Sequence, residues 1–380
     1  LCSTGLNAGR RVVDRLDEDL VHSLIADASA FLARQVGPDG RFVYGYHPCF
    51  DRTIGAYNTL RHASTTYAML EAYEVTQSPL LRDAIEQSII CMTRDLVVHA
   101  LLPNGQLAAF LLEANREIKL GGNAMALLAL TKYADVLGTT DHHDLMVKLA
   151  YGICFMQDPD SGGFRHILRF PDLETQQEFR TIYYDGEATF ALMRFYELSR
   201  DPQWLDRVML AFDRFIASGH SRHHDHWLAY AANELTRFCA EDKYFRFAID
   251  NVADHLDFVE NRITTFPTLL ELMMASGQLF ARLEADSDRS HLLQKIDMAH
   301  FSRALEKRAL YLLNGHFWPE MAMFMRHPRR ILGSFFIRHH AFRVRIDDVE
   351  HYLSGYVAYL RHLKHRAGHD ASIGRSFGTT

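Results

Sequence analysis

Apolar residues recur at three- and four-residue spacing along the chain and alternate with short polar stretches, a pattern that predicts a succession of helices. Six of the predicted helices are rich in small and apolar residues, and each begins with a cluster of polar or aromatic side chains. The beginnings lie near Tyr57, Lys119, Tyr184, His226, Phe266 and Asp347. A more charged amphipathic segment accompanies each one, so the pattern predicts about twelve helices in outer and inner alternation.

The distances between these beginnings indicate a repeat with insertions. Successive intervals are roughly 61, 64, 43, 38 and 84 residues, and helical repeats of about 40 residues are typical of stacked helix pairs. The longer intervals carry insertions around residues 101–118, 158–182 and 313–346. Six helical hairpins can close into a ring, in which the polar beginnings of the inner helices would face one central cavity.

This organisation resembles that of the α/α-toroid proteins, on three features: twelve helices, small-residue inner helices and Gly-rich turns such as DPDSGGF at 158–164. The six-hairpin carbohydrate-active enzymes are nearest by unit number and length. They include glycoside hydrolases, N-acylglucosamine 2-epimerase-like proteins and uronate-acting enzymes. The resemblance implies an all-α (α/α)6 toroid with short β-hairpin-like insertions over residues 1–366, followed by a polar tail at 367–380. It does not fix a reaction.

Composition narrows the classes of function. The 380 residues are 48% hydrophobic, enough for a large core, and the net charge of −6 gives no basic field for nucleic acid. No apolar run reaches the length of a membrane span. We therefore expect no nucleic-acid partner and no transmembrane segment. The resemblance implies a polar, possibly anionic sugar or glycan as the substrate in the central cavity.

The cysteines bear on metal sites and compartment. The five are scattered without a CxxC pair, which argues against a disulfide framework or a structural zinc site and favours reduced thiols. The cytoplasm is therefore slightly favoured over the periplasm. The chain begins at Leu1 rather than Met, which suggests a fragment or processed form and leaves the compartment open. With no HExxH, facial triad or zinc spacing, we expect no required metal and no cofactor.

The first candidate cluster is Tyr184-Asp185-Gly186-Glu187, with Tyr184 as a predicted substrate contact and Asp185 and Glu187 as predicted catalytic residues. Carboxylates at the start of a helix lie at the favourable end of its dipole, and Asp185 fits an N-cap. Glu187 would face the cavity if its helix is an inner one. It is a candidate general acid or base, with a buried hydrogen-bonded structural role as the alternative.

The second cluster is the run from Arg345 to Tyr352 (RIDDVEHY). We predict substrate binding for Arg345 and Asp347, and acid/base roles for Asp348 and His351. Either aspartate can also cap the helix that follows. Asp347 and His351 lie four positions apart and therefore share one helix face.

The third cluster is Tyr57, Asn58, Arg61 and His62. A cation in the first helical turn opposes the dipole, so Arg61 needs compensation. A salt bridge to Asp347, Asp348 or Glu187 would supply it, and substrate binding is the alternative. We predict Tyr57, Asn58 and Arg61 as substrate contacts and His62 as a proton shuttle.

Two further features complete the set of candidates. His226 and Trp227 begin another inner helix and are predicted substrate contacts, with a core position as the alternative for Trp227. The stretch 322–346 is rich in Arg and lacks acidic residues, so it is a candidate surface for an oligomer contact or an anionic partner. Its segments 335–338 and 342–345 alternate and predict a hairpin over the cavity.

Three interpretations of function stay open from the sequence. The leading one is a glycoside hydrolase that uses paired carboxylates. The second is a sugar epimerase or polysaccharide lyase that uses His or Tyr with Arg. The third is a non-catalytic toroid that binds glycan or protein in polysaccharide biosynthesis.

Overall fold

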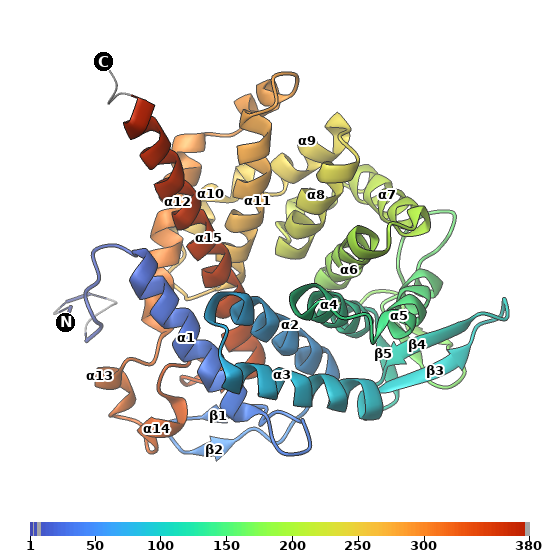
Figure 1. The fold of residues 1–380 in the computed structure, drawn as a ribbon, viewed down its shortest axis with the longest axis horizontal. Helices are drawn as coiled ribbons and strands as arrows, with labels where there is room; N and C mark the ends of the chain where they lie inside the picture. Colours follow the sequence, from blue (N-terminus) through green and yellow to red (C-terminus); the bar gives the residue numbers. More distant parts are fainter. Residues whose placement is uncertain (3, 6–8, 377–380) are drawn as a thin grey trace.

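Six inner helices form a closed ring in the computed structural model, which describes residues 1, 2, 4, 5 and 9–376, with side chains through residue 366 (Figure 1). They are α2 (Thr59–Thr76), α4 (Leu120–Leu137), α6 (Tyr183–Ser199), α8 (His226–Phe238), α11 (Thr268–Glu284) and α15 (Ile346–Ser376). Each packs on the next, and α15 packs on α2. All six begin within two residues of the beginnings predicted from the sequence, so the predicted ring is confirmed.

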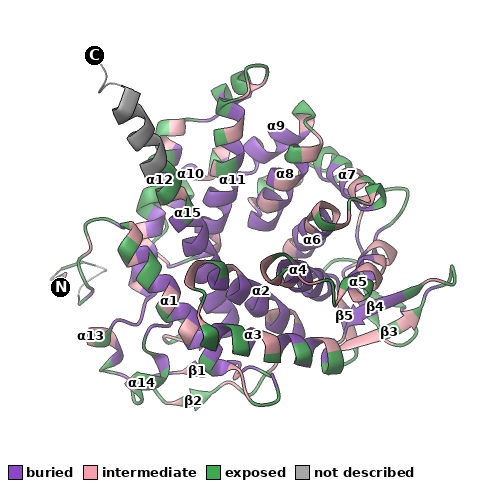
Figure 2. Cartoon of the chain, viewed as in Figure 1, coloured by how far each residue is buried: buried purple, intermediate pink, exposed green. Residues whose placement is uncertain are grey.

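An outer layer of helices packs on the ring. It comprises α1 (Glu18–Gln35), α3 (Pro79–Cys91), α5 (His143–Met156), α7 (Pro202–Ala217), α9 (Asp242–Asp250) and α12 (Met298–Tyr311). The core lies between the layers and between neighbouring inner helices, which are buried over most of their length (Figure 2). In α4 every residue from Ala124 to Leu130 is fully buried.

Short 3-10 turns interrupt the outer layer near two of its helices. The segment after α9 breaks into a 3-10 turn at Ala253–His255 and α10 (Leu256–Asn261). The break follows from Asn251, whose buried side chain exchanges two hydrogen bonds with the backbone of Asp225, at 3.1 and 2.8 Å. Another 3-10 turn, Ser290–Lys295, precedes α12, and Asp297 caps α12 by accepting from the N–H of His300 at 2.9 Å.

Short antiparallel strands occupy the insertions. The pair β3 (Val97–Leu101) and β4 (Leu107–Leu111) projects beside α5, while β5 (Glu117–Lys119), β6 (Ile167–Arg169) and β7 (Thr175–Gln177) form a second sheet. A third sheet has the order β2 (Arg52–Thr53), β1 (Gly45–His47), β8 (Val344–Arg345). The hairpin predicted in the last insertion is reduced to one bridge, Ile337 to Arg343, because Val344 and Arg345 pair with β1 instead.

The last insertion and the final helix complete the chain. Two four-residue helices, α13 (Pro319–Ala322) and α14 (Pro328–Ile331), precede β8. Helix α15 continues to Ser376, into the segment 367–380 for which the sequence predicted a polar tail, and residues 377–380 lie outside the described part. Among the described helices, none combines the length and apolar character needed to cross a membrane.

A belt of ionic contacts links the C-terminal halves of the inner helices. Glu74 on α2 binds both Lys132 on α4 and Arg361 on α15, each at 2.6 Å. Further along the ring, Arg237 on α8 binds Glu197 on α6 at 2.8 Å. These contacts lie at the end of the ring opposite to the polar helix beginnings, so the two ends have separate sets of charged groups.

Arg308 on α12 fixes the loop that leads into α11. Its guanidinium is 1% exposed and donates to the carbonyls of Val259, Arg262 and Thr264 at 2.6–3.0 Å. Burying the cation lowers its pKa to about 10. The loop it holds supplies residues 265–267 to the cavity described below.

We expect Arg308→Met to lower the free energy of unfolding by about 3 kcal/mol, because it leaves buried carbonyls without donors. Chemical denaturation measures the change. Arg303→Met, at an exposed position of the same helix, should stay within about 0.5 kcal/mol of the wild type. Equal effects of the two substitutions would contradict the anchoring role.

Candidate active site at the helix beginnings of the ring

A cavity of about 470 Å³ lies where the beginnings of the inner helices meet. Helices α2, α6, α8, α11 and α15 contribute to its wall, together with residues from the segment 337–345. Ten of the residues that the sequence predicted line it: Asn58, Arg61, Tyr184, Glu187, His226, Trp227, Arg345, Asp347, Asp348 and His351. The helix beginnings therefore converge as the repeat predicted.

Three predicted site residues, Tyr57, His62 and Asp185, do not line this cavity. His62 is fully buried, with Nδ1 2.7 Å from the Tyr57 hydroxyl and Nε2 3.0 Å from the carbonyl of Ser88. Burial lowers the pKa of His62 to about 4. One ring nitrogen thus joins α2 to α3, and the other binds the loop before α2.

Asp185 lies inside the first turn of α6, and the N-cap position predicted for it belongs to Ile182. Its carboxylate accepts a hydrogen bond from Nε2 of the buried His166 at 3.0 Å. Because Nδ1 of that ring accepts from the N–H of Arg180 at 2.9 Å, the second nitrogen must carry the proton. Asp185 therefore orients a histidine that supports the loop before α6.

Helix α4 contributes no residue to the cavity wall, and Gly121 explains why. A Cβ atom at this position would meet the carboxylate of Glu187 and approach Cδ1 of Tyr184 to 2.6 Å. The backbone of α4 therefore packs directly behind these two side chains. Gly121 leaves the space in which Glu187 reaches the cavity.

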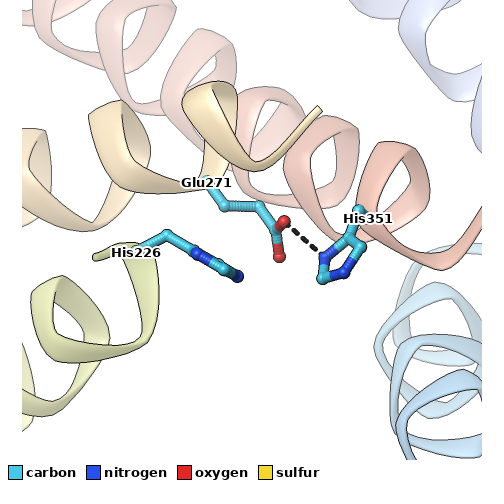
Figure 3. Close-up of side chains that lie close together, drawn as sticks. All are labelled: His226, Glu271 and His351. Carbon is cyan, nitrogen blue, oxygen red and sulfur yellow. Dashed lines mark hydrogen bonds and ion pairs between the residues drawn. The ribbon is translucent and has the colours of Figure 1, made fainter. Parts of the chain in front are cut away.

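His351, on α15, forms a buried ion pair. Its Nδ1 lies 2.8 Å from Oε2 of Glu271 on α11 (Figure 3). Its Nε2 lies 3.8 Å from Oε1 of Glu350. Burial alone would lower the pKa of His351, but the charges of Glu271 and Glu350 and the hydrogen bond that the ring donates to Glu271 raise it to about 9. The imidazole is therefore protonated at neutral pH.

His226, on α8, faces His351 in the opposite protonation state. The two rings meet edge to face with centroids 5.5 Å apart, and both point toward Glu271 (Figure 3). Burial, with the positive charge of His351, lowers the pKa of His226 well below its usual range. Its Nδ1 lies 3.5 Å from a carboxylate oxygen of Asp225, and its buried Nε2 has no hydrogen-bond partner in the described structure.

Glu187 supplies a second unpartnered group. Its Oε2 atom is buried without a hydrogen bond among the described residues. Burial and the nearby Asp225 raise the pKa of Glu187 well above its usual range. Burial thus favours the protonated acid, the form in which Glu187 can donate a hydrogen bond into the cavity.

The aspartates at the start of α15 are held by arginines. Asp347 forms ion pairs with both Arg61 and Arg345, and the carboxylate of Asp348 binds Arg343 through two hydrogen bonds at 3.1 Å. The salt bridge expected to compensate Arg61 is therefore confirmed, with Asp347 as its partner. Both aspartate side chains in the wall are therefore engaged in ion pairs with arginine.

The histidines and Glu271 also bear on metal binding. One possible ligand atom from each of His226, Glu271 and His351 lies within 4.8 Å of the others. Two imidazoles and a carboxylate are a donor set that first-row transition ions use. The His351–Glu271 contact already uses two of these groups as an ion pair.

Sequence reasoning missed the roles of Glu271, Glu350 and Asp225. It assigned almost no ionisable group to the beginning of α11, where Glu271 is the fourth helical residue. The available signal was an acidic residue inside the apolar run TLLELMM, one turn from the helix start. Glu350 lies within the run RIDDVEHY, between two candidate residues. In the structure Ser64 and Thr65 of α2 donate to its carboxylate at 2.6 and 2.8 Å.

Comparison with known proteins defines the fold. No protein-family model matches the chain, and no curated protein matches its sequence. Solved structures do match it. The fold is an (α/α)6 toroid. The cellobiose 2-epimerase of Bacillus thermoamylovorans aligns over 91% of this chain and 100% of its own, with a TM-score of 0.67 and 12% identity.

Two further toroids show the same fold with other activities in their names. A D-mannose isomerase aligns over 91% of this chain and 98% of its own, with a TM-score of 0.65 and 12% identity. The GH76 α-mannanase of Bacteroides thetaiotaomicron aligns over 90% of this chain and 97% of its own, with a TM-score of 0.59 and 11% identity. One scaffold thus serves different reactions, so the side chains of the cavity must decide between them.

We expect Gly121→Ala to lower the free energy of unfolding by about 2 kcal/mol, because the added methyl group displaces Glu187 and Tyr184. Thermal and chemical melts measure it. Gly122→Ala is the matched control, since its Cβ would meet no atom closer than 3.6 Å. That variant should be neutral or gain up to about 1 kcal/mol from helix propensity. A neutral Gly121→Ala would contradict the close packing of α4 on Glu187.

Proposed function

We propose that the protein moves a proton at the carbon beside the carbonyl group of a reducing sugar, as an epimerase or an aldose–ketose isomerase. The observation that supports this most is the pair formed by His226 and His351. Two imidazoles face one cavity, and their surroundings hold one neutral and the other protonated. A base and an acid are thus present together at neutral pH.

The proposed reaction uses one ring nitrogen of each histidine. Nε2 of His226 has an unused lone pair and takes the proton from the sugar carbon. The electron pair of the broken C–H bond moves toward the carbonyl group and gives an enediolate. Nε2–H of His351 then returns a proton. Return to the opposite face of the same carbon gives the epimer, and return to the neighbouring carbon, with a shift of the hydroxyl proton, gives the isomer.

Two further groups suit the charge that develops on the sugar oxygen. Burial favours the protonated form of Glu187, whose unpartnered Oε2 can then donate a hydrogen bond to it. The guanidinium of Arg61 lines the same cavity and adds positive charge. Fixed donors aimed at a developing oxyanion stabilise the transition state more than the substrate.

The names of some structural neighbours describe an isomerase or an epimerase. Those that match include proteins named D-mannose isomerase and cellobiose 2-epimerase. At 12% identity they support the fold, and the proposal for the reaction rests on the cavity of this chain. A carbohydrate substrate also suits a concave site of this size with converging polar groups.

Hydrolysis of a glycosidic bond is the second candidate, because Glu187 has the raised pKa of a general acid. Neighbours named α-mannanase and unsaturated glucuronyl hydrolase share the fold. A hydrolase of this kind needs a second carboxylate to act as base or nucleophile. Asp347 and Asp348 lie in the same wall, but their ion pairs with arginine engage both.

Deuterium exchange tests the two functions against each other. We expect D-mannose or cellobiose, incubated with the protein in D2O, to acquire deuterium beside the carbonyl carbon as epimer or isomer forms. His226→Gln and His351→Gln should each lower that rate by about 100-fold or more, because each removes one proton-transfer group. NMR of the sugar measures both.

Glu187→Gln is informative in the same assay because it keeps a hydrogen-bond donor but cannot give up a proton. Under the epimerase or isomerase proposal it retains more activity than either histidine variant. Release of free sugar from a glycoside without deuterium incorporation, abolished in Glu187→Gln, would instead establish the hydrolase. Unchanged rates of deuterium incorporation in both histidine variants would contradict the proposed chemistry.

The pH dependence gives a separate prediction. The reaction needs protonated His351, so kcat/KM should fall above pH about 9, where that group loses its proton. Glu271→Gln removes a negative charge that stabilises the imidazolium, so the pKa of His351 falls. The alkaline limb of the profile should then move to lower pH by about one unit or more.

Glu71→Gln is the matched control for that shift. Glu71 is also a carboxyl group with a pKa raised by burial, but it bonds the hydroxyl of Ser354 at 2.6 Å instead of an imidazole. Its substitution should leave the alkaline limb in place. An unchanged profile in Glu271→Gln would contradict the role of His351 as the acid.

A further inference from the structure

A second cavity adjoins the reaction cavity. It has a volume of about 300 Å³ and is lined by Ile263, Thr264, Thr265, Tyr311, Asn314, Arg338 and His339. Thr265 and His339 line both cavities. The two spaces therefore share a wall made of one residue from the loop before α11 and one from the segment before β8.

The shared wall contains a polar group without a partner. Thr265 is 7% exposed, and its buried Oγ1 atom has no hydrogen bond in the described structure. A buried hydroxyl without a partner costs free energy, so such groups are uncommon in folded proteins. Because Thr265 belongs to both linings, a ligand spanning the two cavities would lie beside this hydroxyl.

Hydrogen bonds hold the loop that lines the rest of the second cavity. Its floor is the loop that Arg308 holds through the carbonyls of Val259, Arg262 and Thr264. The hydroxyl of Tyr311 donates to the carbonyl of Ile263 at 2.5 Å, which fixes the aromatic ring against the same loop.

Asn314 adds a directed polar group to this cavity. Its Nδ2 donates to the carbonyl of Tyr311 at 3.0 Å, which fixes the orientation of the amide. No hydrogen bond is formed by its Oδ1 with the described residues, so this atom can accept one from a ligand. None of the seven lining residues is acidic.

We propose that this second cavity is a subsite for the next glycosyl unit of the substrate, whose reducing sugar occupies the reaction cavity. The proposal rests on the proposed function and narrows it: the substrate is a disaccharide or a longer glycan with a free reducing end. Hydroxyl and amide groups with one fixed aromatic ring suit a sugar ring, which carries hydroxyls around an apolar face. Thr265 marks the junction between the two units.

Equilibrium binding tests the subsite without relying on turnover. Isothermal titration calorimetry compares D-glucose with cellobiose and D-mannose with mannobiose, because each pair shares the same reducing sugar. We expect the disaccharide to bind more tightly by about tenfold in at least one pair. Asn314→Leu, which lies only in the second cavity, should weaken the disaccharide by about three- to tenfold and leave the monosaccharide unchanged.

Thr268→Val is the matched control, because Thr268 lines only the reaction cavity. It should change both members of a pair by the same factor, and thermal melts confirm that each variant is folded. Equal binding of both members in both pairs, a preference that Asn314→Leu leaves intact, or no binding at all would overturn the subsite. A preference that Asn314→Leu removes, with no deuterium exchange, supports the subsite and overturns the proposed reaction.

Discussion

The contact of the last inner helix with the first is the interaction on which the rest of the structure depends. Arg61 binds Asp347, Ser64 donates to Glu350 and Ser354 donates to Glu71, across sequence separations of 283–286 residues. These groups are largely buried, and a buried ionisable group is tolerated only when its charge is paired or when the group is neutral. Closure therefore satisfies the charges of α2 and α15, and at the same time brings His351 into the cavity opposite His226.

Carboxylates beside one ring make the two histidines different. Burial lowers the pKa of a histidine, and it acts on both rings. Glu271, with the more distant Glu350, raises the pKa of His351, so this ring keeps its proton. The pKa of His226 is lowered by burial and by the positive charge of His351. The proposed base and acid thus arise because the acidic neighbours stabilise the charge of only one ring.

The sequence predicts the ring and the place of the cavity, because helical periodicity and small-residue spacing are local properties. It also predicts that Arg61 needs an acidic partner, since an unfavourable charge at a helix start is visible in one segment. It does not predict Glu271 as the partner of His351, since these residues lie 80 positions apart and only the packing of α11 on α15 joins them. The hydrogen bonds of His62 and Asp185 are likewise tertiary, so both appeared to be cavity residues.

The pairing of β8 with β1 has a consequence for synthesis of the chain. The backbone of Val344 and Arg345 meets β1 at Gly45, where any side chain would collide with the carbonyl of Val344. At the mouth of the cavity, β8 is therefore joined to a strand that is made much earlier in synthesis, since Arg345 pairs with Gly45. Until residues 344–361 leave the ribosome, α2 lacks its neighbour and its polar face stays open to water. The ring of a nascent chain therefore cannot close until α15 has been made.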